Sequence, residues 1–141
     1  MESAIERLAV AIEYPERVPA GATSYVFAVD DAEVVARESG GRLLLERRLW
    51  EASSGDEETA ARIPGMLARY AAGRILREDA TLAWDPDSDA AILWQDIPSS
   101  APAERLRRFF EVFAASCDWW NERLQEALTP EPVFPEMVIR P

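Results

Sequence analysis

Four aspartates between positions 85 and 96 have a spacing that could bind calcium. Asp85, Asp87 and Asp89 match the first alternating ligand positions of an EF-hand loop, and Asp96 matches its last ligand position. Ala90, however, stands where that loop needs a glycine, and its last ligand is normally a glutamate. The flanking runs are typical of strands, whereas an EF-hand loop joins two helices. We therefore predict a solvated hairpin turn and no metal site.

The segment SCDWWNER, residues 116–123, offers a second chemical candidate, a reactive thiol at Cys117. The chain has no histidine and no lysine, and Cys117 is its single cysteine. These absences exclude a Ser-His-Asp or Cys-His nucleophile, a lysine Schiff base, a P-loop lysine and the usual structural zinc sites. Carboxylate acid–base chemistry remains, but no motif supports it. The sequence therefore predicts a protein that is not an enzyme and has no cofactor.

The formal net charge of −11 argues against a nucleic-acid partner, because affinity for a phosphate backbone requires a cationic surface. Acidity also keeps a protein soluble by self-repulsion and favours neutral or basic partners, and charge alone does not choose between these roles. No apolar run approaches the roughly 18 residues of a membrane span, and the N-terminal residues lack the features of a secretory signal. With one unpaired cysteine, these features predict a soluble, cytoplasmic protein that does not contact a membrane.

The elements that carry these residues follow from hydrophobic periodicity and turn signals. We expect helices over residues 2–13, 64–76 and 103–128, and strands over residues 24–29, 32–39, 42–50, 80–84 and 90–97. The order α-βββ-α-ββ-α predicts a single α+β domain with an antiparallel sheet, spanning residues 1–128. Residues 129–141 contain four prolines and are expected to form an extended C-terminal arm.

Local signals set several boundaries. Gly40 and Gly41 favour a tight hairpin turn, because glycine readily adopts positive φ. Ser54 with Glu57 resembles a helix capping box. Pro64 cannot donate a backbone hydrogen bond, so we expect a break there, with the main second helix starting at Pro64.

The last helix is the most strongly amphipathic element. Its apolar stripe recurs at steps of three and four and consists of Leu106, Phe109, Phe110, Phe113, Cys117, Trp120, Leu124 and Leu128. Cys117 falls near the centre of this stripe and is predicted to be buried, as is Trp120, whereas Asp118 faces solvent. Trp119 lies about 100° around the helix from Trp120, on a shoulder shared with Val112, and is a candidate contact residue. The apolar face of the first helix is made of Ile5, Leu8, Val10 and Ile12.

Apolar side chains occupy both faces of several predicted strands. In the first strand, Tyr25, Phe27 and Val29 share one face while Val26 and Ala28 share the other. The same conflict recurs where Leu44 opposes Leu43 and Leu45, and where Ile92 and Trp94 oppose Leu93. A sheet covered by helices on one side normally carries polar residues on its open face. Either the helices cover both faces, or an apolar patch is covered by a partner or a second copy of the chain.

Three arginines, Arg105, Arg107 and Arg108, form a basic patch at the start of the last helix. Cations at a helix N-terminus oppose the helix dipole, and nearby carboxylates such as Glu104 and Glu111 could offset that cost. The patch either contacts an acidic segment of a partner or covers apolar surface with its arginine stems.

The segments MLARYAAGRILREDATLAWDPDSDAAILWQDIP and RLRRFFEVFAASCDWWNERL, with the element order, the acidity and the length, resemble the CesT-type (class I) chaperones of bacterial type III secretion. The first segment is similar to the helix that leads into two apolar strands in that family, and the second to its closing helix. The resemblance covers residues 1–128. It implies a homodimeric cytoplasmic chaperone without ATPase activity, which holds an extended N-terminal segment of a secreted effector ready for export.

The resemblance also implies two sets of contact residues. The effector-binding candidates, to which the helix shoulder adds Trp119, are Ile5, Ile12, Val26, Val35, Leu44 and Trp119. The dimer-interface candidates are Leu67, Tyr70, Trp84 and Trp94.

Two other functions are compatible with the sequence. One is a regulatory adaptor that binds a folded partner instead of an unfolded segment. The other is a small-ligand-binding α+β domain, which would need acidic residues facing a concave apolar pocket, whereas most carboxylates here fall in predicted loops or on predicted solvent faces.

Overall fold

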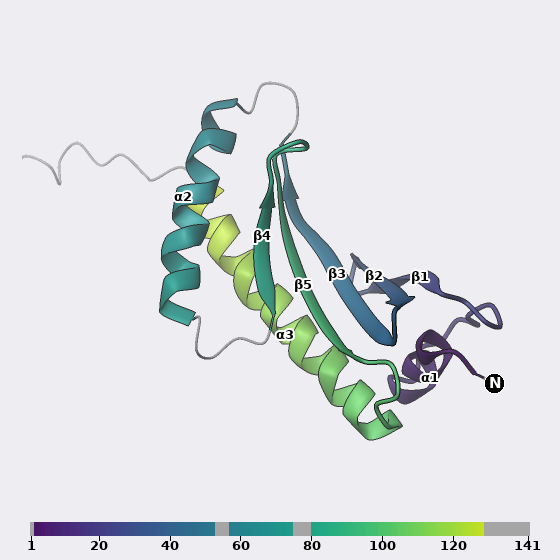
Figure 1. The fold of residues 1–141 in the computed structure, drawn as a ribbon. Coiled ribbons are helices and arrows are strands. Elements are labelled where there is room, and N and C mark those ends of the chain that lie inside the picture. The colour runs from purple at the N-terminus through teal and green to yellow at the C-terminus, as the bar shows by residue number, and fades with distance from the viewer. Residues whose placement is uncertain (1, 53–56, 75–79, 129–141) are drawn as a thin grey trace, which may run out of the picture.

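The structure, a computed structural model, describes residues 2–52, 57–74 and 80–128 (Figure 1). The elements are α1 (Ala4–Ala11), β1 (Ser24–Val29), β2 (Ala32–Ser39), β3 (Arg42–Glu51), α2 (Glu57–Arg74), β4 (Thr81–Asp85), β5 (Ala90–Pro98) and α3 (Ala103–Leu128). This order confirms the predicted α-βββ-α-ββ-α fold. The proposed cap at Ser54 and the C-terminal arm lie outside the described residues.

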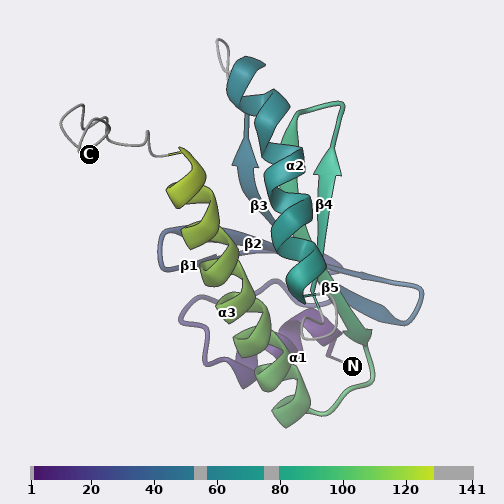
Figure 2. The same ribbon diagram turned by 90° about the vertical axis from the view of Figure 1, so that its left-hand side faces the viewer.

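The strands form one antiparallel sheet in the order β1-β2-β3-β5-β4. The three described helices lie on one face of this sheet, with α2 and α3 side by side and α1 beneath the β1–β2 end (Figures 1 and 2). Alternate strand residues that face the helices are buried: Phe27, Val34, Ala36, Leu43, Leu45 and Leu93. The opposite face carries no helix among the described residues, and we call it the open sheet face.

Two tight turns fix the register of the first three strands. Gly40 and Gly41 both have positive φ, 58° and 76°, which confirms the predicted glycine hairpin. Asp30 and Asp31 join β1 to β2 with φ of 49° and 64°; aspartate is among the few non-glycine residues that tolerate this region. The register matters because a shift by one residue would exchange the two faces of the sheet.

The prediction that α2 begins at Pro64 is wrong: the helix begins at Glu57 and continues through Pro64 to Arg74. Pro64 removes one backbone hydrogen bond, but Ala60, Ile63 and Leu67 lie at helical spacing on both sides of it and are all buried. Ile63 and Leu67 belong to the same apolar core as α3. Burial of this shared stripe holds both halves of the helix in line and outweighs the local cost of the proline.

The first helix is shorter than the predicted 2–13 span, because the chain turns sharply at Glu13, which has a φ of 56°. Its buried stripe is Ala4, Ile5, Leu8 and Ala9. Val10, which the sequence placed on the apolar face, is 72% exposed.

Polar contacts attach α1 to the rest of the domain. The Ser3 hydroxyl accepts from the Glu6 backbone N–H, and the Glu6 carboxylate accepts from the Ser3 N–H, which completes a capping box. Hydrogen bonds to the ionised carboxylate lower the pKa of Glu6. The bond from the Ser3 N–H has the larger effect, and the bond from the Gly21 N–H has the next largest. The Arg7 guanidinium donates to the carbonyl oxygens of Ser99 and Ala101, just before α3. Helix α1 is therefore fixed against the β5–α3 connection.

The core confirms the predicted stripe of α3. Leu106, Phe113, Cys117 and Leu124 are fully buried, and Trp120 is 2% exposed. Trp119 is half-buried, with its ring 6.0 Å from that of Tyr70 on α2 and 5.0 Å from that of Trp120. The two adjacent tryptophans therefore have different environments.

We expect Cys117 to react with Ellman's reagent about a hundredfold more slowly in the native protein than in urea, at the same mildly alkaline pH. Burial raises the pKa of the Cys117 thiol to about 11, and only the thiolate attacks the reagent. Stopped-flow absorbance of both states measures the two rates. Equal rates would contradict the buried position of Cys117.

Candidate protein-binding surfaces

The open sheet face is not covered by any described helix (Figures 1 and 2). A single cross-strand row runs across all five strands, in which Val26 is opposite Val35, Val35 opposite Glu46, Glu46 opposite Trp94, and Trp94 opposite Thr81. Directly opposite residues share a face. Val26 is 47% and Trp94 36% exposed. The row thus places exposed apolar side chains on β1, at one edge of the sheet, and on β5, next to the other edge.

Ion pairs surround these apolar residues. On the same face, Arg37 lies 3.8 Å from Glu46, and Arg42 lies 3.1 Å from Asp96. Each ion pair has no net charge, so these charged side chains give the surface around the apolar residues no excess of one sign. The surface is suited to a partner that brings apolar side chains and few charges.

A hollow of about 390 Å³ lies at the β3–β5–β4 end of this face. We call it the sheet hollow; its lining is mainly apolar and includes Leu44, Ala83, Trp84, Ile92 and Trp94. Trp84 also stacks on Trp50, with ring centroids 6.0 Å apart and planes 20° apart. Trp84 lies opposite the fully buried Ala91, so its side chain packs on the helix side of the sheet, behind the hollow.

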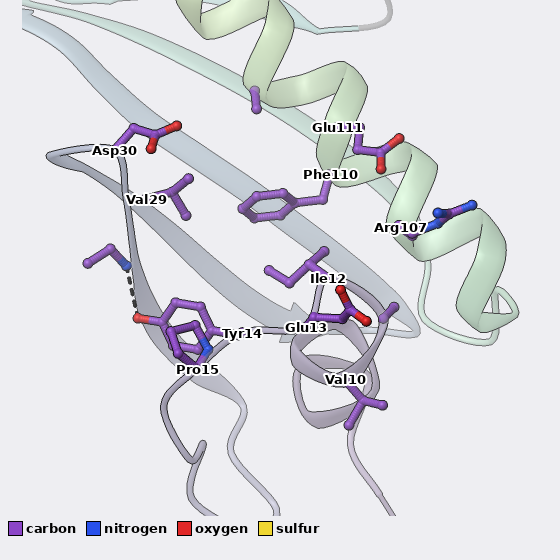
Figure 3. A pocket seen from close by; sticks show the side chains of 13 residues that line it. Val10, Ile12, Glu13, Tyr14, Pro15, Val29, Asp30, Arg107, Phe110 and Glu111 are labelled. Atoms are coloured by element: carbon purple, nitrogen blue, oxygen red, sulfur yellow. Dashed lines mark hydrogen bonds between the residues drawn. The ribbon is translucent and has the colours of Figure 1, made fainter.

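A second concave surface lies between α1, β1 and α3, and we call it the helical cleft (Figure 3). Its volume is about 700 Å³. Phe110 reaches from α3 toward Val29, and Ile12 lies beside it (Figure 3). Charged side chains, among them Glu13 and Arg107, surround this apolar centre. The cleft can hold an apolar side chain while polar groups contact the backbone next to it.

The edge strand β1 separates the helical cleft from the open sheet face. The Ala28 backbone N–H donates to the Tyr14 hydroxyl at 3.1 Å, shown as the dashed line in Figure 3. Tyr14 also packs edge-on against Tyr25 and Phe27. The segment after α1 therefore satisfies one backbone group of β1 that the sheet does not.

The structure places the effector-binding candidates in different environments. Ile12 lines the helical cleft, Val26 and Val35 adjoin one another on the open sheet face, and Leu44 lines the sheet hollow. Ile5 is fully buried in the core and has no surface to offer a partner. Trp119 packs against α2 as described, and the Arg123 guanidinium lies 4.9 Å from the centre of its ring.

The dimer-interface candidates also divide. Trp94 lines the sheet hollow on the open sheet face, whereas Trp84 lies opposite the buried Ala91 and so faces the helices. Leu67 is 3% exposed and belongs to the core, so it acts by holding α2 in place. Tyr70 is half-buried against Trp119.

Ile92 was not among the candidates, although it shares the sheet hollow with Trp94. The sequence did signal it, because Ile92 and Trp94 are two residues apart in a strand and therefore share a face.

The Asp85 loop is a hairpin turn, as predicted: the Asp85 carboxylate accepts from the Asp87 backbone N–H and the Ser88 hydroxyl. Of these two bonds the one from Ser88 contributes more to lowering the pKa of Asp85. No group of acidic or thiol side chains that could hold a metal occurs in the described part of the chain.

No protein-family model and no curated protein sequence matches the chain. Solved structures that are similar to it include the following three. The HopA1–SchA chaperone–effector complex matches with a TM-score of 0.58 and 17% identity, over 84% of this chain and 91% of that chain. The ExoT–SpcS complex from Pseudomonas aeruginosa matches at 0.55 and 16% identity, over 83% and 93% of the two chains. The ExsC–ExsE complex matches at 0.55 and 15% identity, over 92% and 93%.

The chain therefore has the fold of the class I type III secretion chaperones, which confirms the fold that the sequence resemblance implied. None of the described helices has an apolar stretch long enough to span a bilayer.

Proposed function

We propose that the protein is a cytoplasmic type III secretion chaperone that binds an extended N-terminal segment of a secreted effector and keeps it export-competent, without catalysis. The observation that carries this proposal is the open sheet face, with exposed Val26 and Trp94 on a fold whose neighbours are found in complexes. An uncovered apolar sheet face in a soluble domain is a contact surface for another chain.

We assign the effector segment to the helical cleft and the β1–β2 part of the open sheet face. Ile12 lies in the first, and Val26 and Val35 lie in the second. An extended chain advances about 3.3 Å per residue, so a short non-globular segment can cross the β1 edge and reach both. A folded ligand of similar mass could not follow this path around a strand edge.

We assign the sheet hollow, with Trp94 and Leu44, to the contact between two copies of the chain; Trp84 supports it from the helix side of the sheet. The lining of the hollow is apolar, and the charged side chains beside it neutralise one another in ion pairs. Such a surface can pair with an identical surface on a second copy of the chain. Leu44 moves in this proposal from the effector set to the dimer set, because it lines the same hollow as Trp94.

The proposal is tested with N-terminal fragments of proteins encoded beside the gene for this chain. We expect one fragment, insoluble alone, to co-elute with the dimer in size-exclusion chromatography with light scattering, and to exchange its amide hydrogens as an unfolded chain does. Val26→Glu should weaken that complex about tenfold, because the added charge would lose its hydration at an apolar contact. Ala61→Glu, which makes the same kind of apolar-to-acidic change at an exposed position of α2, is the matched control and should bind as wild type.

A strict monomer that solubilises no fragment would reject the chaperone function. Binding only to fragments that are folded on their own would favour the regulatory adaptor instead.

A further inference from the structure

A third concave surface lies between the end of β5 and the first half of α3, and we call it the α3 groove. Its volume is about 390 Å³. Ile97, Phe109 and Val112 give it an apolar floor, and Gln95, Arg105 and Arg108 add polar groups. Val112 is 39% exposed, so the floor is open to solvent.

Gln95 and Trp120 are the two described residues with a buried side-chain polar atom that has no hydrogen-bond partner, and of the two Gln95 lines the α3 groove. It lies opposite the fully buried Leu45 and so faces the helices, with only 8% of its surface exposed. Its side-chain oxygen Oε1 is buried and accepts no hydrogen bond from any described residue. A buried acceptor without a donor destabilises a folded protein. A ligand N–H in the groove would satisfy it.

Arg105 and Arg108 are three residues apart on α3 and line the groove together. Neither has an ion pair or side-chain hydrogen bond in the described part of the chain. Arg107, on the same turn of the helix, donates to Glu104 at 3.1 Å. Asp96 also borders the groove, but its carboxylate is bonded to Arg42 on the open sheet face. Two guanidinium groups near the helix N-terminus therefore oppose the helix dipole without a carboxylate partner.

These groups together select one kind of ligand. The arginines need an acceptor, for which a carboxylate is the best match in charge, and Gln95 Oε1 needs a donor. Free phosphate at neutral pH is mainly an acceptor, whereas an aspartate or glutamate within a peptide offers its carboxylate and a backbone N–H together. The net charge of −11 repels acidic peptides in general, so any acidic preference must arise locally.

We propose that the α3 groove recognises an acidic residue of the bound segment, with the carboxylate at Arg105 and Arg108 and a neighbouring backbone N–H at Gln95. This inference rests on the proposed function, since it names a residue type that the chaperone selects in its extended partner. It also explains why this part of the basic patch has no internal partner.

The test starts from a phage-displayed library of short random peptides, selected on the immobilised full-length protein. We expect an acidic residue to be enriched about fivefold at one position of the selected motif. A selected peptide and its Glu→Gln or Asp→Asn version are then titrated by fluorescence anisotropy. On the wild type, the amide version should bind about tenfold more weakly.

On the double variant Arg105→Gln/Arg108→Gln, the two peptides should bind within about twofold of each other. Arg62→Gln, which removes an exposed arginine from α2 outside the groove and the helical cleft, should retain the wild-type difference. The assignment would be overturned if the double variant and the control variant lost the same amount of affinity. It would also be overturned if the effects of the peptide change and the protein change on binding were simply additive. So would a change of oligomeric state in the double variant, since the groove would then be an interface between copies.

The outcomes separate the two proposals. If the selected peptides show no acidic preference that depends on Arg105 and Arg108, the proposed role of the α3 groove is rejected. The proposed chaperone function is not affected by that result. Failure to select any peptide would count against both.

Discussion

Replacing Phe113 with alanine is expected to lower the free energy of unfolding by about 3–5 kcal/mol. Phe113 is fully buried at the middle of α3 and belongs to the core shared by α1, the sheet and α3. The substitution removes the ring and leaves a cavity that a rigid sheet cannot fill. Domains of this size are stable by about 5–15 kcal/mol, so a large share of the stability would be lost.

Urea unfolding followed by circular dichroism measures this change. Both proteins are compared at one protomer concentration, because association adds to the apparent stability. Val112→Ala, one residue away and 39% exposed, is the matched control and should change stability by no more than about 1 kcal/mol. If the alanine variant does not fold, Phe113→Leu should still cost about 1–1.5 kcal/mol. A Phe113→Ala loss below about 1 kcal/mol would contradict the core position.

The order of elements could be predicted from the sequence because each element carries its own periodic signal. Strands β1, β2 and β3 are separated by Asp-Asp and Gly-Gly turns, and the stripe of α3 recurs over about six turns of helix without interruption. Helix α2 could not be bounded in this way. Its continuity through Pro64 depends on burial of Ile63 and Leu67 beside α3, a contact between segments far apart in the sequence.

The sites were harder to predict than the fold, because burial within an apolar face depends on the neighbouring element. Ile5 lies in α1 and Ile12 directly follows that helix, yet Ile5 is in the core and Ile12 at the helical cleft. The difference arises because α1 contacts α3 and β2 along one line, and the chain turns away after Ala11. Periodicity in the sequence identifies the apolar face of a helix, but it does not show where the contact between that face and the neighbouring elements ends.

The strand order also hides surfaces from the sequence. Strand β5 inserts between β3 and β4, so Glu46 and Trp94 adjoin although they are far apart in the chain. The same insertion carries Gln95 to the face beneath α3, beside Arg105 and Arg108. The sequence showed the arginines as a basic patch, but only the register reveals the acceptor beside them.

The open sheet face leads to the second large expected effect: Trp94→Glu should convert the proposed homodimer into a monomer. Trp94 is 36% exposed, lines the sheet hollow and lies opposite Glu46. Tryptophan at the centre of an interface commonly contributes 2 kcal/mol or more, and a buried glutamate beside Glu46 adds repulsion. We expect the dimer Kd to rise by about a hundredfold.

Light scattering over a dilution series measures this change, with the monomer identified by its chain mass of 15.8 kDa. Val10→Glu makes the same kind of apolar-to-acidic change at a site that is 72% exposed on α1, and it should leave the dimer intact. Trp94→Ser separates the two causes, because it removes the ring without adding charge and should weaken the dimer less than Trp94→Glu. A Trp94→Glu protein that still dimerises with the wild-type Kd would show that the sheet hollow is not the dimer contact. If that variant instead lost only effector binding, the hollow would belong to the effector path, and the two assignments of the open sheet face would have to be exchanged.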